Sequence, residues 1–382
     1  MPDKNEQLYE VAIGLIPGIG GMLTRQLVSY CGSPKAFFDC PSSKLETIPG
    51  IGPGAIKAFK KRDEALRKAE EVLQQAEKYE AQILFYTHPD YPKRLKQIAD
   101  APTLLFYKGN ASLNHPKTIS IVGTRKLTRY GEAVTEKIIH DLQKHDPLII
   151  SGLAYGIDIV AHRSALKYGL QTIGTIASGL DMIYPAAHKK TAEQMLEQGG
   201  LLSEKIFGIE LHPQFFPARN RIIAGLADCT IIVEGALKSG SLITAEIAFG
   251  YNREVMAVPG NITSEVSGGT NYLIKTQQAV PYTCIEDLEA LLNWDNALQP
   301  PQLGLFDGSP VAKPHRPTVY DPNDFSKEEW AIIEVLQQTN DELIDNISWK
   351  AQIPINQIAS LLLNMEFNGV VKSLPGKKFR LL

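Results

Sequence analysis

Cysteine is scarce in this chain: Cys31, Cys40, Cys229 and Cys284 are the only four among 382 residues. No two of them form a C-x-x-C pair, and the eight histidines contain no H-x-x-x-H spacing. Structural zinc sites and disulfide frameworks depend on such patterns. We therefore expect neither a metal centre nor a disulfide scaffold.

Long apolar runs and a strong excess of charge of one sign are also missing. No stretch of 18 apolar residues occurs, and the segment from Met1 to Glu10 is polar and charged, unlike a signal peptide. The formal net charge is only -3, so a nucleic-acid surface would have to be a local patch. These absences predict a soluble, cytoplasmic protein.

The common nucleotide and hydrolase motifs are absent. The segment from Gly235 to Ser241 imitates the spacing of a phosphate-binding P-loop, but Ser241 stands where the motif needs lysine. No G-x-G-x-x-G follows the apolar segment Ile119–Val122, and no G-x-S-x-G occurs. Nucleoside-triphosphate hydrolysis, a nicotinamide cofactor and a serine nucleophile are therefore disfavoured, and no cofactor is expected.

The first 80 residues are expected to form a helical domain of the helix-hairpin-helix or SAM-like kind. Ile16-Pro-Gly-Ile-Gly20 recurs as Ile48-Pro-Gly-Ile-Gly52, and each copy precedes a helical pattern. Two glycines allow a tight turn between helices. The motif resembles helix-hairpin-helix turns, whose amides contact a DNA phosphate; a bundle turn that binds nothing is the alternative.

Residues 81–295 alternate between strand and helix patterns. Expected strands are Ile83–Tyr86, Leu104–Tyr107, Thr118–Val122, Leu148–Ile150, Thr172–Ala177, Leu201–Ser203, Thr230–Val233, Val255–Val258 and Ala279–Tyr282. Expected helices are Glu132–His145, Ile157–Tyr168, Lys190–Gln198, Leu242–Asn252 and Ile285–Leu292. Continuous apolar strands between helices predict an α/β fold with an extended Rossmann-like, doubly wound parallel sheet. Ligands of such sheets lie at the carboxyl ends of the strands.

Residues 296–324 are rich in proline and lack periodicity, which predicts a linker. Residues 325–382 then show three helical patterns, 327–338, 342–349 and 354–367, and a hairpin pattern at 369–381. This order suggests a small winged-helix domain. Its candidate recognition helix contains no Arg or Lys, so contact with a protein is favoured over readout of DNA.

The most informative stretch begins at Phe216. A basic, amide-rich turn (Arg219, Asn220, Arg221) precedes a short apolar helix and a strand. A loop of small residues, Lys238-Ser239-Gly240-Ser241, then opens another helix that contains Thr244. Free backbone N–H groups at such a helix start form a seat for an anion such as phosphate.

Other loops after strands should converge on the same edge of the sheet. They are Gly123-Thr124-Arg125, the segment beginning Ser151-Gly152, the segment Gly179–Pro185 with His188, Lys189 and Lys190 behind it, and a closing loop with Gly268, Gly269 and Lys275. One such loop is usually only a connector, but several together with arginines favour a polyanion site. Asp158, Asp181, Asp228, Glu234 and Glu246 are possible acids or bases, although capping helices or pairing with arginines is the favoured role for them.

These loops resemble the DNA-processing protein A (DprA, also called Smf) family. The similar segments are Val122-Gly-Thr-Arg, Ser151-Gly-Leu-Ala-x-Gly-Ile-Asp, Gly179-Leu-Asp-x-x-Tyr-Pro, Phe216-Pro-x-Arg-Asn-Arg-Ile-Ile and Lys238-Ser-Gly-Ser-Leu-Ile-Thr-Ala. The resemblance covers roughly residues 1 to 290, and a winged-helix tail is typical of the family. After Tyr-Pro, this chain has Ala186-Ala187-His188 where the family often has an earlier polar or basic residue.

The resemblance implies a non-enzymatic protein that binds single-stranded DNA taken up in natural transformation, protects it from nucleases and helps to load the RecA recombinase. It also implies a homodimer formed through the Rossmann-like domain. Carried over to this sequence, Arg125 and residues 219–221 would bind DNA phosphates, and Gly152, Gly240 and Ser241 would make close contacts. Phe216 is a candidate platform for base stacking, with a buried core position as its alternative. Replacing Arg125 or Arg221 by alanine is then expected to flatten the salt dependence of binding.

An enzyme is the main alternative. The loop before Glu246 is similar in layout to the phosphate-binding loop of nucleoside-monophosphate phosphoribohydrolases of the lysine-decarboxylase-like fold. On that hypothesis, Glu246 would assist cleavage of a glycosidic bond. An adaptor that binds only proteins is a third hypothesis, but it leaves the arginine-bearing loops unexplained.

Overall fold

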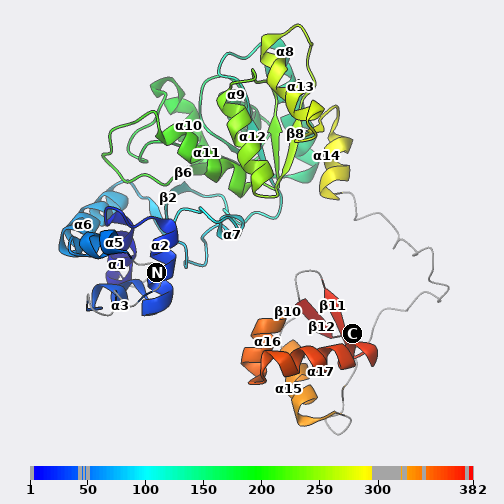
Figure 1. Ribbon diagram of the computed structural model, residues 1–382. Helices are drawn as coiled ribbons and strands as arrows, with labels where there is room; N and C mark the ends of the chain where they lie inside the picture. Colours follow the sequence, from blue (N-terminus) through cyan, green and yellow to red (C-terminus); the bar gives the residue numbers. More distant parts are fainter. Residues whose placement is uncertain are drawn as a thin grey trace, which may run out of the picture. The chain divides into compact units, whose positions relative to one another are not determined.

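A computed structural model describes residues 4–41, 45, 48, 52–294, 320, 325–337, 341–374 and 378–381. The chain forms two compact units, residues 1–299 and residues 300–382. Figure 1 labels helices and strands in both units. No helix in the described ranges is long and apolar enough to cross a membrane.

The larger unit begins with helices. They are α1 (Lys4–Leu15), α2 (Gly21–Cys31), α3 (Pro34–Phe38), α5 (Pro53–Phe59) and α6 (Arg62–Lys78). The first copy of the repeated turn connects α1 to α2, and Gly20 is the N-cap of α2. Gly52 is the N-cap of α5 in the same extended backbone conformation, while residues 49–51 of the second copy lie outside the described residues.

A nine-stranded sheet follows, in the order β1-β2-β6-β5-β4-β3-β7-β8-β9. The strands are β1 (Gln82–Phe85), β2 (Leu104–Gly109), β3 (Thr118–Val122), β4 (Leu148–Ser151), β5 (Thr172–Thr175), β6 (Gly199–Ser203), β7 (Cys229–Ile232), β8 (Glu254–Ala257) and β9 (Val280–Pro281). All nine expected strands are present, with ends shifted by a few residues. The expected mixed α/β fold with a large, predominantly parallel sheet is confirmed.

Two strands depart from the expected parallel arrangement. β1 pairs antiparallel with β2, and β2 pairs antiparallel with β6. Only residues 110–117 connect β2 to β3, which is too short for the dozen or more residues that recross a sheet. Because β2 runs the other way, it ends at the edge where β3 begins, and the short connection suffices.

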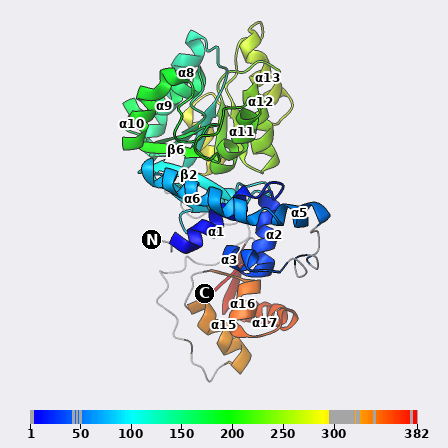
Figure 2. The ribbon, with the colours of Figure 1, turned by 90° about the vertical axis from the view of Figure 1, so that its left-hand side faces the viewer.

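Helices cover both faces of the sheet (Figure 2). One face carries α8 (Arg129–Leu142), α9 (Ile157–Lys167), α10 (Lys189–Glu197) and α14 (Ile285–Leu292). The other face carries α7 (Lys93–Lys96), α11 (Phe215–Leu226), α12 (Gly240–Gly250) and α13 (Gly268–Lys275). Short 3-10 turns complete the unit: η1 (Gln143–His145), η2 (Ala186–His188) and η3 (Glu265–Ser267).

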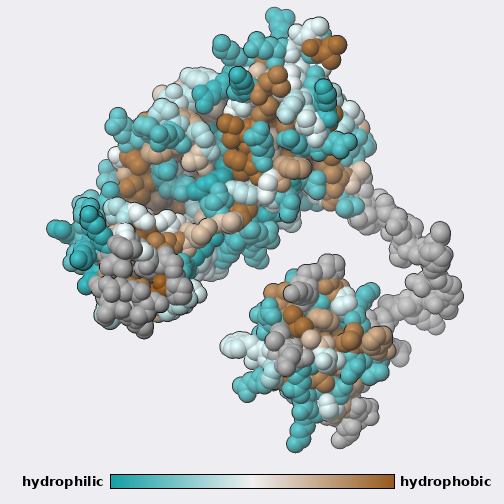
Figure 3. Space-filling view, viewed as in Figure 1, coloured by the Kyte–Doolittle hydropathy of each residue, from teal (hydrophilic) through white to brown (hydrophobic). Residues whose placement is uncertain are grey.

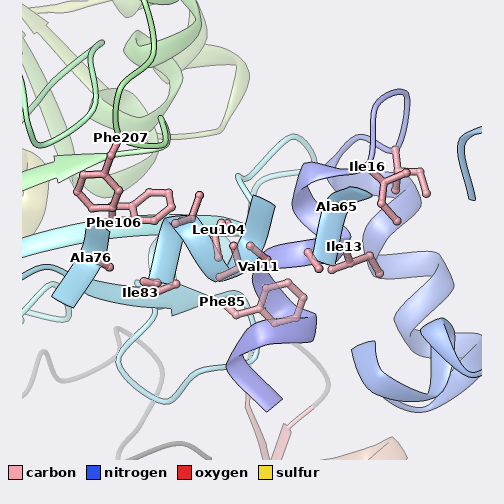
Figure 4. Close-up of a cluster of buried hydrophobic side chains, with 14 of the residues drawn as sticks. Val11, Ile13, Ile16, Ala65, Ala76, Ile83, Phe85, Leu104, Phe106 and Phe207 are labelled. Atoms are coloured by element: carbon pink, nitrogen blue, oxygen red, sulfur yellow. The ribbon is translucent and has the colours of Figure 1, made fainter. Parts of the chain in front are cut away.

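The parallel strands divide their side chains between two cores. Ile149 packs with α8 and α9, whereas Leu148 and Ile150 pack with α11 and its neighbours. This alternation is the two-residue period of a strand buried on both faces. The N-terminal helices share a further core with the antiparallel edge of the sheet, where Val11 and Ala65 pack with Phe85 and Phe106 (Figure 4).

Two segments differ from the sequence-based expectation in a way that matters for the site. Residues 219–221 lie inside α11, because Pro217 stands in the first helical turn, where proline is tolerated, rather than in a turn before the helix. Gly268 and Gly269 begin α13 and do not form a closing loop. Adjacent glycines disfavour a helix, but the N–H of Gly269 donates to the carbonyl of Gly235 at 2.8 Å.

The smaller unit contains α15 (Lys327–Gln337), β10 (Glu342–Leu343), α16 (Ile344–Ala351), α17 (Ile355–Phe367), β11 (Val371–Leu374) and β12 (Lys378–Leu381). Its three strands pair in the order β10-β12-β11. The short strand β10 was not expected from the sequence. The predicted linker, residues 296–324, lies outside the described residues except for Tyr320.

Candidate functional site

An open pocket of about 610 Å³ lies at the carboxyl edge of the parallel strands, and we call it the edge pocket. The loop after β3, the segment after β4, and the first turns of α11 and α12 surround it. Its lining residues are Val122, Gly123, Thr124, Arg125, Ala154, Asp158, Tyr184, Pro213, Phe216, Pro217, Arg219, Asn220, Ile223, Ser239, Gly240, Ser241, Ile243 and Thr244. The structure therefore brings together ten of the residues that the sequence nominated.

The loop after β3 presents Arg125 to the pocket. The N–H of Thr124 donates to the carbonyl of Glu234 at 2.7 Å, which fixes the loop beside β7. The Arg125 side chain is exposed, and within the described residues it makes no hydrogen bond or ion pair. Its guanidinium carbon lies 5.5 Å from the centre of the Phe216 ring. Arg125 is thus available to a ligand, and its planar fork suits a phosphate.

Aromatic rings form one wall of the edge pocket. Phe216 stands in the first turn of α11, is half-buried, and belongs to none of the hydrophobic cores. Tyr184 meets it edge to face, with 5.8 Å between ring centres, and is 49% exposed. The alternative that Phe216 is a buried core residue is therefore wrong. Its stacking against a base stays a prediction.

Arg219 forms the floor of the pocket. It is 6% exposed, and its Nη1 donates to the carbonyl of Gly152 at 2.5 Å and to the carbonyl of Thr175. Burial lowers its pKa to about 10, although the nearby Asp158 carboxylate acts in the opposite direction. Arg219 therefore ties the ends of β4 and β5 together through Nη1, while its buried Nε has no hydrogen-bond partner among the described residues.

The buried carboxyl group of Asp158 faces the same floor. Burial raises its pKa, and the positive charge of Arg219 opposes that rise. A Cβ atom on Gly152 would lie 2.4 Å from Nη1 of Arg219 and 2.5 Å from Oδ2 of Asp158. Glycine is therefore required at position 152 for the two charged groups to approach the backbone. Ser151, next to it, is buried and donates its hydroxyl to the carbonyl of Ile121 at 2.6 Å.

The amino end of α12 points its first amides at the pocket. Ser239 is the N-cap, and no side chain caps these amides. Nothing lies within 4 Å of the position that a Cβ on Gly240 would take. Asn220 donates its side-chain amide to the carbonyl of Gly240 at 3.4 Å, which joins α11 to α12. Uncapped amides and the positive end of the helix dipole make this end a seat for an anion.

Arg221 corrects one expectation about this site. Arg221 was expected to bind DNA phosphates together with Arg125, but it does not line the edge pocket. Its Nη2 pairs with Oε1 of Glu204 at 2.5 Å, and its Nη1 donates to the carbonyl of Asp100. Residues two apart in sequence lie on different faces of a helix, so Arg219 and Arg221 diverge. Arg221 stabilises the join between α11 and the β6 side of the sheet.

Six other nominated residues also lie outside the pocket lining: Ser151 and Gly152, described above, and the two lysines and two glycines that follow. Lys238 is exposed beside it, and Lys275 is exposed at the far end of α13. Gly268 and Gly269 begin α13 behind the segment that follows β7. The predicted closing loop is therefore a helix, and its first residues pack against the segment that follows β7.

The candidate acids and bases mostly have structural partners. Glu234 accepts hydrogen bonds from the N–H and hydroxyl of Thr128, the N-cap of α8, and Asp228 pairs with Arg94 at 2.7 Å. Glu246 is exposed on α12 and does not line the edge pocket. Within the described ranges, no group of three or more His, Cys, Asp or Glu side chains could hold a metal ion.

Tyr184 is the main site residue that the sequence reasoning missed. It follows β5 and lines both the edge pocket and a smaller hollow formed with Gly152, Tyr155 and Phe216. Its position inside the segment Gly179–Pro185 carried a signal, since that loop was expected at the same edge of the sheet. An aromatic residue in such a loop can serve as a platform for a base.

Comparison with known proteins gives a consistent family. Residues 82–293, more than half of the chain, match the family described as DNA recombination-mediator protein A. The chain is 30% identical to protein Smf of Synechocystis over 99% of both chains. It is 44% identical to DNA processing protein DprA of Streptococcus pneumoniae over 48% of this chain and 65% of that protein.

Two solved structures are also similar. The crystal structure of DprA from Streptococcus pneumoniae matches 76% of this chain and 98% of that one, with a TM-score of 0.64 and 33% identity. A structure of DprA from Helicobacter pylori, whose title concerns its single-stranded DNA binding mode, matches 56% of this chain and 96% of that one, with a TM-score of 0.51 and 31% identity. The chain therefore belongs to the DNA recombination-mediator protein A family, which includes DprA and Smf.

Proposed function

We propose that this protein binds single-stranded DNA in the edge pocket and delivers it to a recombinase. The observation that carries the proposal is the meeting of three ligand-binding features at one edge of the sheet. These are the guanidinium of Arg125, which has no hydrogen-bond or ion-pair partner among the described residues, the partly exposed ring of Phe216, and the first amides of α12, which no side chain caps. A phosphate and its neighbouring base need this combination of groups.

The strand would be held by its backbone and stacked by its bases. Arg125 and the amides of Gly240 and Ser241 would bind phosphate oxygens without reading sequence, and the Phe216 and Tyr184 rings would stack on bases. The rings form part of the pocket wall, so a base must be unpaired to reach them. A duplex keeps its bases inside the helix, and this difference predicts a preference for single strands.

The relatives support this assignment. The Helicobacter pylori protein is described as binding single-stranded DNA, and the Streptococcus pneumoniae protein is named a DNA processing protein. We extend the proposal to protection of incoming DNA in natural transformation, to loading of RecA, to a cytoplasmic location and to a homodimer formed through the sheet-bearing unit. These four points rest on membership of the family.

We propose that the protein is not an enzyme. The phosphoribohydrolase alternative needs a carboxylate beside the scissile bond of a bound nucleotide. Glu246 is exposed away from the lining of the edge pocket, and Asp158 is buried next to Arg219. Incubation with a panel of mononucleotides would settle this point, since released base would favour the enzyme.

The smaller unit is proposed to be a winged-helix domain that contacts protein. Its order of helices, followed by the hairpin of β11 and β12, fits that fold. α17 would be the recognition helix, and it contains no Arg or Lys. Reading a major groove normally requires such side chains.

The central experiment is a gel shift that compares single-stranded with double-stranded oligonucleotides at moderate salt. We expect tighter binding of the single strand, and a strand already covered by this protein should accelerate RecA filament formation. Equal affinity for both DNA forms, or no binding, would contradict the proposal.

A further inference from the structure

A second charged surface lies at the corner between α5 and α6, far along the chain from the edge pocket. Residues 57–68 contain six Lys or Arg and two Asp or Glu, a net charge of +4. The whole chain has a formal net charge of -3, so the remaining residues together carry -7. The corner is therefore a local cationic patch on an acidic protein.

Three lysines dominate this patch, Lys57, Lys60 and Lys61, which we call the lysine corner. All three are exposed, and within the described residues none has a carboxylate partner within ion-pair distance. Figure 3 shows a hydrophilic surface over the neighbouring helix α6. Like charges this close repel one another, and this cost falls when an external anion binds between them.

The nearby acidic groups do not neutralise the lysine corner. Asp63 lies 3.9 Å from Arg62, which itself rests 4.5 Å above the Phe59 ring. Asp63 and Glu64 also precede Arg67 and Lys68 by four residues on α6, a spacing at which opposite charges face each other. Asp63 is thus paired with Arg62, and the spacing on α6 favours Arg67 and Lys68 over the lysine corner as partners of the two carboxylates.

The corner has a fixed backbone. Phe59 is 1% exposed and packs edge to face on Phe37 of α3, with 5.1 Å between the ring centres. Ala58 is buried as well. The lysines on either side of these anchors therefore extend from a rigid turn into solvent, and the anchoring reduces the entropy cost of engaging a ligand.

These observations distinguish a polyanion from a small anion. The lysines are spread along an exposed corner and do not line the edge pocket or the smaller hollow beside it, in contrast to Arg125. Flexible, strongly hydrated ammonium groups are typical contacts for regularly spaced phosphates that are not read by sequence. We propose that the lysine corner is a second contact for the phosphate backbone of DNA, used by strands that extend beyond the edge pocket.

The fold provides a connection between the two surfaces. α6 has 17 residues, so it carries the chain about 25 Å from the corner to Tyr79. The Tyr79 ring stacks on Phe207 at 5.5 Å, and Phe207 stands in the segment that leads from β6 to α11 and Phe216. We expect a long strand to contact both surfaces and a short strand that fills the edge pocket to contact only that pocket. The inference rests on the function proposed above.

The test uses the full-length protein with a triple variant, Lys57→Gln, Lys60→Gln and Lys61→Gln. Binding is measured across a salt series for a short oligonucleotide and for one several times longer. We expect the slope of log affinity against log salt to fall by about 2 for the long strand, at roughly 0.7 per phosphate, and to stay unchanged for the short one. A matched variant, Lys93→Gln, Lys137→Gln and Lys167→Gln, removes the same charge elsewhere and should keep the original slope.

Each contrary outcome overturns the inference. If the triple variant kept the wild-type slope for the long strand, the lysine corner would not contact DNA. If the matched variant showed an equal fall in slope, the effect would come from net charge alone. Equal weakening of the short strand would indicate damage to the edge pocket. If the triple variant no longer bound vesicles of anionic phospholipid but kept its DNA affinity, the corner would be a membrane contact. Failure of the proposed function can be distinguished from failure of this inference. If the edge pocket did not bind DNA, Arg125→Ala would also leave the binding of both strands unchanged.

Discussion

The guanidinium of Arg125 lies 5.5 Å from the centre of the Phe216 ring, across the mouth of the edge pocket. A cation above an aromatic face is stabilised by the ring, so the two side chains orient each other before a ligand arrives. A phosphate on Arg125 and a base on Phe216 are then adjacent groups of one nucleotide strand. Phosphate binding is therefore assigned to Arg125 and base stacking to Phe216. The two contributions can be tested by separate variants.

Loss of an aromatic ring should weaken binding without changing its salt dependence. Tyr184→Ala and Phe216→Ala are each expected to cost about 1–3 kcal/mol of binding free energy, the usual worth of one stacked base. The ring carries no charge, so the number of released counterions stays the same. Fluorescence anisotropy across a salt series measures both quantities.

Tyr184→Phe is the matched control, because it keeps the ring and should bind like the wild type. An oligonucleotide with abasic positions provides the second check, since wild type and Tyr184→Ala should bind it equally. A flattened slope in Tyr184→Ala would instead place this residue in phosphate binding and contradict the account.

A side chain at position 152 should disturb the floor of the pocket. Gly152→Ala places a methyl group within 2.5 Å of both Arg219 and Asp158, so one of these charged groups must move. Forced overpacking of this kind typically costs about 1–3 kcal/mol in the free energy of unfolding. Gly240→Ala introduces the same methyl group into open space and should leave the stability unchanged in urea denaturation. Equal stabilities of the two variants would refute this description of the floor.

Arg221 is predicted to act on stability through Glu204. The two side chains form an ion pair with 16% and 27% of their surfaces exposed, and Arg221→Ala should cost about 1–3 kcal/mol of unfolding free energy. A double-mutant cycle with Glu204→Ala measures the coupling directly. A coupling energy near zero would show that Arg221 is free for another partner, which would restore it as a candidate for DNA contact.

His162 should make the protein less stable in acid. Burial lowers its pKa to about 3, with smaller contributions from the charges of Arg219 and His188, and its Nδ1 lies 2.7 Å from the Thr172 hydroxyl. The unfolded chain takes up a proton near pH 6.5, while the folded chain does not. The stabilising contribution is therefore complete above pH 6.5 and is lost as the pH falls toward 3.

The check is urea denaturation of wild type and His162→Gln between pH 7 and pH 4. The wild type should lose stability more steeply, by up to about 1.4 kcal/mol per pH unit, because one additional proton binds on unfolding. Parallel pH profiles for the two proteins would show that His162 takes up its proton in the folded state.

Much of the sheet could be predicted from the sequence because its strands are short apolar runs between amphipathic helices. Segments such as Ile149 and its neighbours pack on both faces, and that pattern is visible without a structure. The direction of β2 was not predictable from its own residues. It depends on the short connection to β3 and on pairing with β6, which is distant in the chain.

The candidate site also has features that the sequence predicts and features that it does not. Loops after parallel strands necessarily meet at one edge, so the convergence of Arg125 with Ser239 and Gly240 followed from strand order. The separate faces of α11 did not follow, because residues 219–221 were expected to form a turn before the helix. Once Arg219 and Arg221 are placed on a helix, one is directed to the pocket floor and the other to Glu204. The loop that carries Tyr184 was expected at this edge, but only the three-dimensional contact with Phe216 shows that its ring lines the pocket.

The most direct test of the central claim compares Arg125→Ala with Arg221→Ala in single-strand binding across a salt series. The account predicts that Arg125→Ala weakens binding for all sequences and lowers the slope by about 0.7 for each phosphate that the protein no longer neutralises, while Arg221→Ala keeps the wild-type slope. An unchanged slope for Arg125→Ala, or a flattened slope for Arg221→Ala alone, would contradict the placement of the strand in the edge pocket.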